Sequence, residues 1–238
     1  MTERYSDDFD IPVLAAGESP LHGYRGEVDD ESLVGIPAGV SIAISREAGA
    51  RGATIARRAG EKLGWEVFSQ DMLEYGAQSA SLREEVLSKL PSKATEWVDE
   101  QLQTLLDQPN ISRHPNLVDL ARLVLALGAQ GNVILLGRGA GFLLPSRSTL
   151  HVRLVAPLPD RITYMSQWLR LTEEEAAEQV RKRDNRRTDF LATHFHRKPN
   201  DVHLYDLIVN TSRFGEERSA DLVVAAAKAK MLAILGME

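Results

Sequence analysis

IAISREAGARGATIA, residues 42–56, is the stretch that decides the fold of this chain. An apolar strand over 40–44 runs into a glycine-bearing turn, and that turn opens a helix. This order aims the helix N-terminus and several backbone N–H groups at one point, where a phosphate would be stabilised. The stretch therefore has the architecture of a phosphate-binding loop.

The loop departs from the common pattern G-x-x-x-x-G-K-[ST]. In that pattern the lysine contacts the β- and γ-phosphates, and the hydroxyl residue binds Mg²⁺. Here Gly52 stands at the lysine position and Ala53 follows, with Thr54 one step later. Taken alone, the stretch fits a phosphate site and an ordinary strand-to-helix turn equally well, because Gly49 and Gly52 would serve either.

Composition limits the class of protein. The 238 residues are 43% hydrophobic and 26% charged, which suits one soluble α/β domain with an inserted or appended subdomain. The net charge of −6 argues against a nucleic-acid partner, so an anion site needs a local cluster of arginines. The absence of cysteine excludes disulfides, thiolate zinc sites and a thiol nucleophile.

The ends and the hydropathy of the chain indicate where it works. No apolar run approaches the ~20 residues that span a bilayer, and the first ten residues, MTERYSDDFD, are unlike a signal peptide. We expect a cytoplasmic protein with no membrane partner. Residues 1–38 show no periodicity, which predicts an extended or partly disordered arm that could pack on the body or form a homodimer.

Strand and helix patterns alternate through the rest of the chain, so we expect a parallel sheet with helices on both faces. The loops after Ile44, Leu136 and Ala156 should then converge at the carboxyl edge of that sheet. The expected strands are 40–44, 65–68, 133–136, 151–156 and 207–210. The expected helices are 54–63, 70–90, 92–107, one following 115, 160–170, a long one from 172, and 216–234.

A second candidate site is the turn Gly137-Arg138-Gly139-Ala140-Gly141, directly after an apolar strand. A dinucleotide fingerprint would need glycine at Phe142 and a sustained helix, which Pro145 cuts short. A turn of small residues that presents Arg138 explains the pattern better than a dinucleotide site. The Arg138 guanidinium can form a bidentate contact with a phosphate. A surface salt bridge of Arg138 is the alternative.

A third candidate is the cationic run 181–187, RKRDNRR, late in a helix that the capping box Thr172–Glu175 begins. Arg183 and Arg187 are four residues apart and share a helix face. Arginines that close over a transferred phosphoryl group neutralise its charge and exclude water, although such runs are usually just solvated faces. The scattered histidines predict no metal cage, and no G-x-S-x-G hydrolase motif occurs.

Three segments together resemble the cytidylate kinase-like family, a branch of the P-loop nucleoside monophosphate kinases. They are ISREAGARGATIARRAGEKLG, ILLGRGAGFLL and HVRLVAPLPDRI…VRKRD…LYDLIVNTS, and the similarity spans roughly residues 40–233. The resemblance implies a three-layer P-loop NTPase-type fold with a five-stranded parallel sheet. It also implies transfer of the ATP γ-phosphoryl group to a monophosphate such as CMP, with Mg²⁺ bridging the phosphates.

The same resemblance implies a domain over 39–238, with a helical NMP-binding region at about 70–130 and an arginine-bearing lid at about 172–203. It assigns phosphate and metal contacts to the loop and substrate contacts to later arginines. The nucleotide-binding set is Arg46, Gly49, Arg51, Gly52 and Thr54, with Thr54 also on Mg²⁺. The catalytic set is Arg138, Arg181, Arg183 and Arg187, with Asp184 beside them, and Asn210-Thr211-Ser212 matches a D-T-S stretch.

Four substitutions depart from cytidylate kinases themselves: Gly52, Ala53, Ser69 in place of an aspartate, and Leu136 in place of the Asp of D-G-R. A missing cation beside the phosphates removes several kcal/mol of charge stabilisation, on the order seen for single oxyanion-hole donors. Arg46 or Arg51 could replace it from the same loop. Three functions stay open: a nucleotide kinase, a catalytically impaired nucleotide-binding regulator, and a module that binds a partner chain through the arm and residues 70–107.

Overall fold

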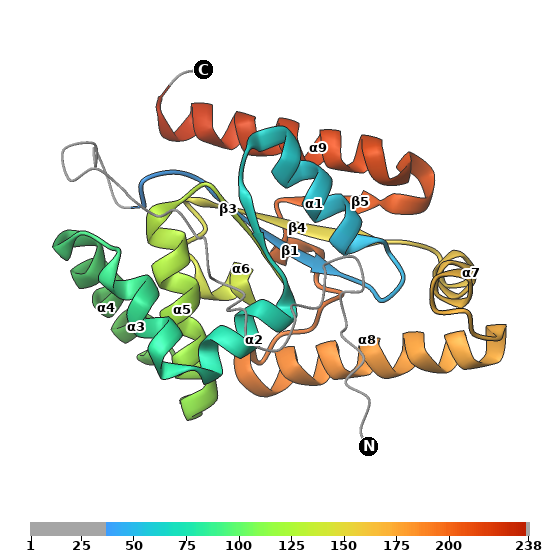
Figure 1. The fold of residues 1–238 in the computed structure, drawn as a ribbon, viewed down its shortest axis with the longest axis horizontal. Helices are drawn as coiled ribbons and strands as arrows, with labels where there is room; N and C mark the ends of the chain where they lie inside the picture. The colour runs from blue at the N-terminus through green and yellow to red at the C-terminus, as the bar shows by residue number, and fades with distance from the viewer. Residues whose placement is uncertain (1–36, 237–238) are drawn as a thin grey trace.

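A five-stranded parallel sheet lies between two helical layers in the computed structural model, which describes residues 37–236 (Figure 1). The strand order is β2-β3-β1-β4-β5, and every neighbouring pair is parallel. The strands are β1 (Ser41–Arg46), β2 (Glu66–Phe68), β3 (Val133–Leu136), β4 (Thr149–Val155) and β5 (Leu207–Asn210). The predicted α/β architecture is confirmed.

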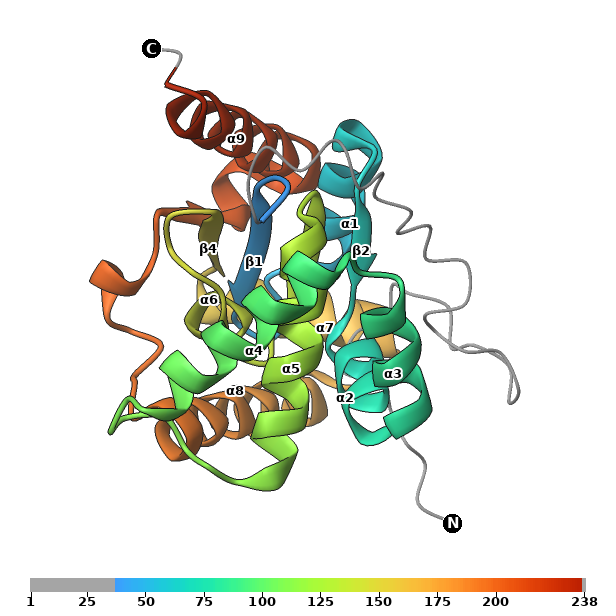
Figure 2. The same ribbon diagram turned by 90° about the vertical axis from the view of Figure 1, so that its left-hand side faces the viewer.

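The two layers follow from the alternation of side chains along the strands. Ile42 and Ile44 of β1 are buried against α1 (Gly52–Leu63) and α9 (Thr211–Ile234), whereas Ala43 faces the opposite core. Figure 2 shows the opposite layer edge on. Its helices are α2 (Gln70–Gln78), α3 (Ala80–Ser88), α4 (Ser92–Leu106), α5 (Pro115–Gln130), α6 (Ala140–Leu143) and α8 (Glu173–Phe195).

Helix α7 (Leu158–Leu169) packs on the N-terminal half of α8, and a small core of the two helices includes Ala48 of the loop after β1. Helix α8 begins with the predicted capping box. The Thr172 hydroxyl accepts from the Glu175 amide, and the Glu175 carboxylate accepts from the Thr172 amide. The loop and the arginine-rich helix therefore belong to one packed unit.

Helix boundaries differ from the sequence expectation at several places. The expected helix 70–90 is two helices, because Ser79 is extended and caps α3 by accepting from the Leu82 amide. Helix α1 starts at Gly52, two residues earlier than expected. Helix α9 starts at Thr211 and is interrupted at Gly215, whose φ of 71° is not helical. A short 3₁₀ turn (Val202–Leu204) precedes β5.

The expected arm, 1–38, falls outside the described residues except for Pro37 and Ala38. No helix within 37–236 is long and apolar enough to cross a bilayer. The proposed boundaries of an NMP-binding region at 70–130 and a lid at 172–203 remain predictions. Helices α2 to α5 lie in the first range, and α8 lies in the second.

Candidate phosphate-binding site

The ends of three strands meet at one edge of the sheet, as expected. The Gly137 amide, after β3, donates to the carbonyl oxygen of Ile44 in β1 at 2.9 Å. The Ala156 amide, after β4, donates to Glu47 Oε2 at 3.1 Å. These bonds bring the loops after β1, β3 and β4 together, at the place where open α/β sheets bind ligands.

The N-terminus of α1 opens at this edge. Arg51 is its N-cap residue in the left-handed conformation (φ 60°), and the Ile55 amide donates to the Arg51 carbonyl as the first helical bond. The amides of Gly52, Ala53 and Thr54 therefore have no carbonyl within the helix to donate to. No acidic side chain stands in this first turn. The helix start thus keeps its positive end toward the loop.

Two charged side chains far away in sequence hold the loop. Asp184 of α8 accepts from the Ala48 amide at 2.7 Å through Oδ1 and from Arg161 Nη1 at 2.6 Å through Oδ2. Arg161 of α7 also donates to the Ala48 carbonyl at 3.1 Å, and its Nε lies 3.4 Å from Glu47 Oε2. The loop backbone is thereby fixed by side chains from α7 and α8.

Gly49 shows how closely Arg161 packs against the loop. Its φ is 81°, and a Cβ there would lie 2.6 Å from the Arg161 carbonyl oxygen. Arg161 was not among the residues expected to form the site. The sequence did contain a signal for such a role, because Arg161 lies in the first turn of a helix that directly follows the end of a strand.

Arg46, the last residue of β1, is 95% buried in the same cluster (5% exposed). Its stem lies against Gly52, and its Nη2 is 3.4 Å from Gln70 Oε1 of α2. Its carbonyl accepts from Arg187 Nη1 of α8 at 3.4 Å. Arg46 therefore joins β1, α2 and α8 around the start of α1.

Arg138 lies in the turn after β3, and its backbone has the left-handed conformation (φ 49°). Its guanidinium forms an ion pair with Glu74 of α2 and lies over the ring of Phe190 from α8, 4.9 Å from the centroid. Glu74 also accepts from Gln70 Nε2 at 3.3 Å. A chain of polar contacts thus runs from Arg46 through Gln70 and Glu74 to Arg138.

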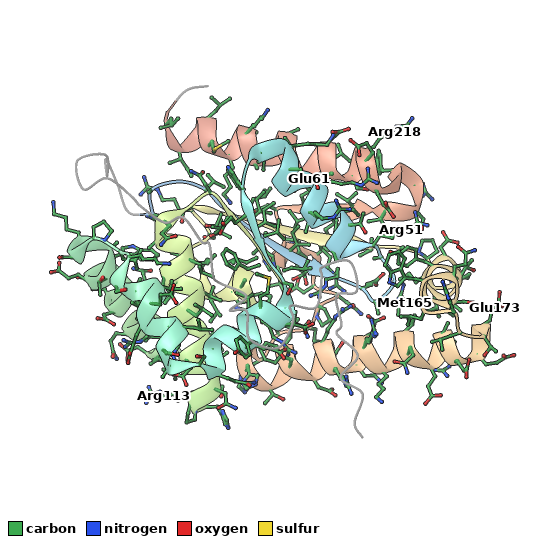
Figure 3. All side chains as sticks on the ribbon, viewed as in Figure 1. Arg51, Glu61, Arg113, Met165, Glu173 and Arg218 are labelled. Atoms are coloured by element: carbon green, nitrogen blue, oxygen red, sulfur yellow. The ribbon has the colours of Figure 1, made fainter. Side chains whose placement is uncertain are left out.

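The structure does not gather every predicted arginine around the loop. Arg187 Nη1 lies 4.0 Å from Asp184 Oδ1, beside the loop. Arg183 is buried, whereas Arg181 is exposed on α8. The Arg51 side chain extends the other way: Figure 3 shows it between the start of α1 and helix α7. There Arg51 Nε lies 3.9 Å from Glu216 Oε1, and Arg51 Cζ lies 5.0 Å from the centroid of the Tyr164 ring.

Two histidines near this edge have lowered pKa values, which favours their neutral form. His151 of β4 packs between Phe142 and Tyr205, and burial lowers the pKa of His151 to about 4. Its Nε2 is 3.2 Å from the Ser45 hydroxyl, in β1. Burial also lowers the pKa of His194, beside Arg138. The positive charge at this edge therefore comes from arginines and the start of α1.

Thr54 is the residue of the loop that could contribute a ligand to a metal ion bound with phosphates. Among residues 37–236, no three His, Cys, Asp or Glu side chains are grouped so that they could hold one. Thr54, which is 7% exposed in the first turn of α1, supplies a hydroxyl at the helix start. One protein hydroxyl together with phosphate oxygens suits Mg²⁺, which usually keeps several waters.

Comparisons with known proteins agree with this architecture. The chain is 26% identical to the cytidylate kinase of Methanopyrus kandleri over 197 residues, covering 79% of this chain and 92% of that one. It is 34% identical to the uronate isomerase of Corynebacterium glutamicum over 103 residues, a match that spans 43% of this chain and only 20% of that protein.

The fold resembles that of an uncharacterized protein from Eubacterium ventriosum, with a TM-score of 0.64 at 16% identity, covering 80% of this chain and 98% of that one. The sequence profile of one family matches residues 41–213, which hold β1 to β5, the loop and the arginines of α8. The chain belongs to the cytidylate kinase-like family.

Proposed function

We propose that the protein is a nucleoside monophosphate kinase that transfers the γ-phosphoryl group of ATP to a monophosphate acceptor such as CMP. The observation that carries the proposal is the meeting of the α1 N-terminus with the buried Arg46 of β1, whose carbonyl accepts from Arg187 of α8, in a chain of this family. The M. kandleri relative, aligned over most of both chains, is named for the same activity.

The chemistry we propose is positioning and electrostatic stabilisation. Amides of the loop and of the first turn of α1 hold the phosphates of ATP, and Thr54 contributes its hydroxyl to the accompanying Mg²⁺. Arg138, Arg183 and Arg187 neutralise charge that builds on the transferred group. Bound Mg²⁺ would offset phosphate charge during the transfer. The acceptor phosphate is itself an anionic nucleophile, so no general base is needed.

The ion pair of Arg138 with Glu74 sets a condition on acceptor binding. A monophosphate that uses Arg138 must take the guanidinium from Glu74, or bind its remaining N–H groups. The first route requires a shift of α2 or of the Glu74 side chain, and the second leaves the ion pair in place. Gln70, which also donates to Glu74, would keep that carboxylate partnered after the exchange.

The alternative is a nucleotide-binding regulatory or partner-binding protein with impaired catalysis. Gly52 in place of lysine and Ala53 in place of the hydroxyl residue favour it. A coupled assay of ADP release with ATP and each nucleoside monophosphate separates the two. Turnover above the rate without acceptor supports the kinase, and ATP-dependent thermal stabilisation without turnover supports the regulator.

A further inference from the structure

We propose that Arg46 replaces the missing lysine of the phosphate loop and that Gly52 is glycine because Arg46 passes over it. The glycine at 52 and the arginine at 46 are then one coupled exchange. This inference rests on the proposed function, since it names the cation that meets the phosphates of ATP.

The first support is steric. A Cβ on Gly52 would lie 2.8 Å from Cγ, 3.1 Å from Cβ and 3.3 Å from Cδ of Arg46. Real Cβ atoms essentially never approach another heavy atom to less than 3.0 Å. The Arg46 stem would have to move, and it is 95% buried (5% exposed) at the end of a central strand. A side chain at 52 and the Arg46 stem in this position therefore compete for the same space.

The second support is where the guanidinium lies. From the end of β1 it crosses the start of α1 toward the end of β3, where a Cβ on Gly137 would overlap Nη1. Its other terminal nitrogen reaches Gln70. A lysine in the first turn of α1 would extend from the same helix start, so the arginine brings its charge to the same place from the other side of the loop.

The third support is the contrast with Arg51, the other cation of the loop. Arg51 lies beside Glu216 and Tyr164, between α1 and α7, and its side chain is 37% exposed. Arg46 instead lies beside the turn that carries Arg138, and Arg187 donates to its carbonyl. Of the two loop arginines, only Arg46 therefore lies beside Arg138 and Arg187, which belong to the proposed catalytic set.

The test uses the full chain and measures ATP binding in EDTA, so that it needs no turnover. We expect Arg46→Gln, which keeps a stem over Gly52 without charge, to weaken ATP binding about tenfold or more, the lower end of what a hydrogen bond to a charged group contributes. Arg46→Lys should bind more tightly than Arg46→Gln. Arg57→Gln removes an exposed arginine of α1, paired with Glu61, and should bind like the wild type.

The steric part is tested by exchange. We expect Gly52→Lys alone to lower the melting temperature and to weaken ATP binding, and Arg46→Gly with Gly52→Lys to recover both. If Arg46→Gln does not fold, the double variant decides: recovered binding supports the exchange, and a folded double variant without ATP binding overturns it. Wild-type affinity in Arg46→Gln also overturns it, whereas a wild type that binds no ATP refutes the proposed function itself.

Discussion

Protonation of His151 should account for part of the stability that this protein loses on acidification. The imidazole is 7% exposed in β4, with rings of Phe142 and Tyr205 on either side, and burial is the largest cause of its lowered pKa. The charged groups that face it are Arg153 and Lys230, which lower the pKa further, and Asp206, which raises it. The folded state therefore holds this ring neutral well below its usual pKa.

The sign and size follow from linkage. Above pH 6.5 the ring is neutral in both states, so the shift contributes nothing to the free energy of unfolding. Between pH 6.5 and about 4 only the unfolded chain binds the proton, so the free energy of unfolding falls with decreasing pH. Lowering the pKa of His151 from 6.5 to about 4, at about 1.4 kcal/mol per pH unit, corresponds to about 3–4 kcal/mol well below pH 4, and to about 2–3 kcal/mol between pH 7.5 and pH 4.5.

Urea unfolding monitored by tryptophan fluorescence at pH 7.5 and pH 4.5 measures this loss. Carboxylates titrate over the same range, so the comparison is with His151→Gln, which keeps polar atoms for the Ser45 hydroxyl and cannot titrate. His203→Gln, at an exposed position, is the matched control and should lose as much stability as the wild type. Parallel losses in wild type and His151→Gln would refute the assignment.

Three further changes test the loop and its supports. Gly137→Ala should cost about 1–3 kcal/mol, more than Gly64→Ala, because both have positive φ but only at 137 would the new Cβ overlap a neighbour; urea unfolding compares them. Asp184→Asn should cost about 1–3 kcal/mol and lower the ADP-release rate by freeing the loop, whereas Asp189→Asn, exposed on the same helix, should change neither. Thr172→Ala should lower stability by about 1 kcal/mol in the same unfolding assay, and no loss would mean that the capping box contributes little.

Local patterns in the sequence were sufficient for the architecture. The apolar runs 133–136 and 207–210 became central and edge strands, and the alternation of strand and helix implied parallel pairing. The capping box at Thr172 begins α8 as expected, because its partners are three residues apart. The convergence of the loops after Ile44, Leu136 and Ala156 followed from parallel strands ending at one edge.

Patterns of composition could not show which side chains face the loop. Asp184 is 136 positions from the Ala48 amide that it accepts from, and Arg161 bridges the two. The break at Ser79 between α2 and α3 was also missed, because the surrounding residues favour one continuous helix and only the extended cap residue divides it. Such contacts depend on how helices pack and have no local signature.

The sequence by itself determined the strand–loop–helix unit at 42–56, the parallel sheet around it and the family, since each depends on periodicity or on residues in fixed local order. Only the tertiary structure decided what the glycine at 52 means. In sequence it is an absent lysine; in the fold it is the space over which the Arg46 stem passes. Close packing makes that difference, because one buried long side chain and one residue without a Cβ share a volume that neither position reveals alone.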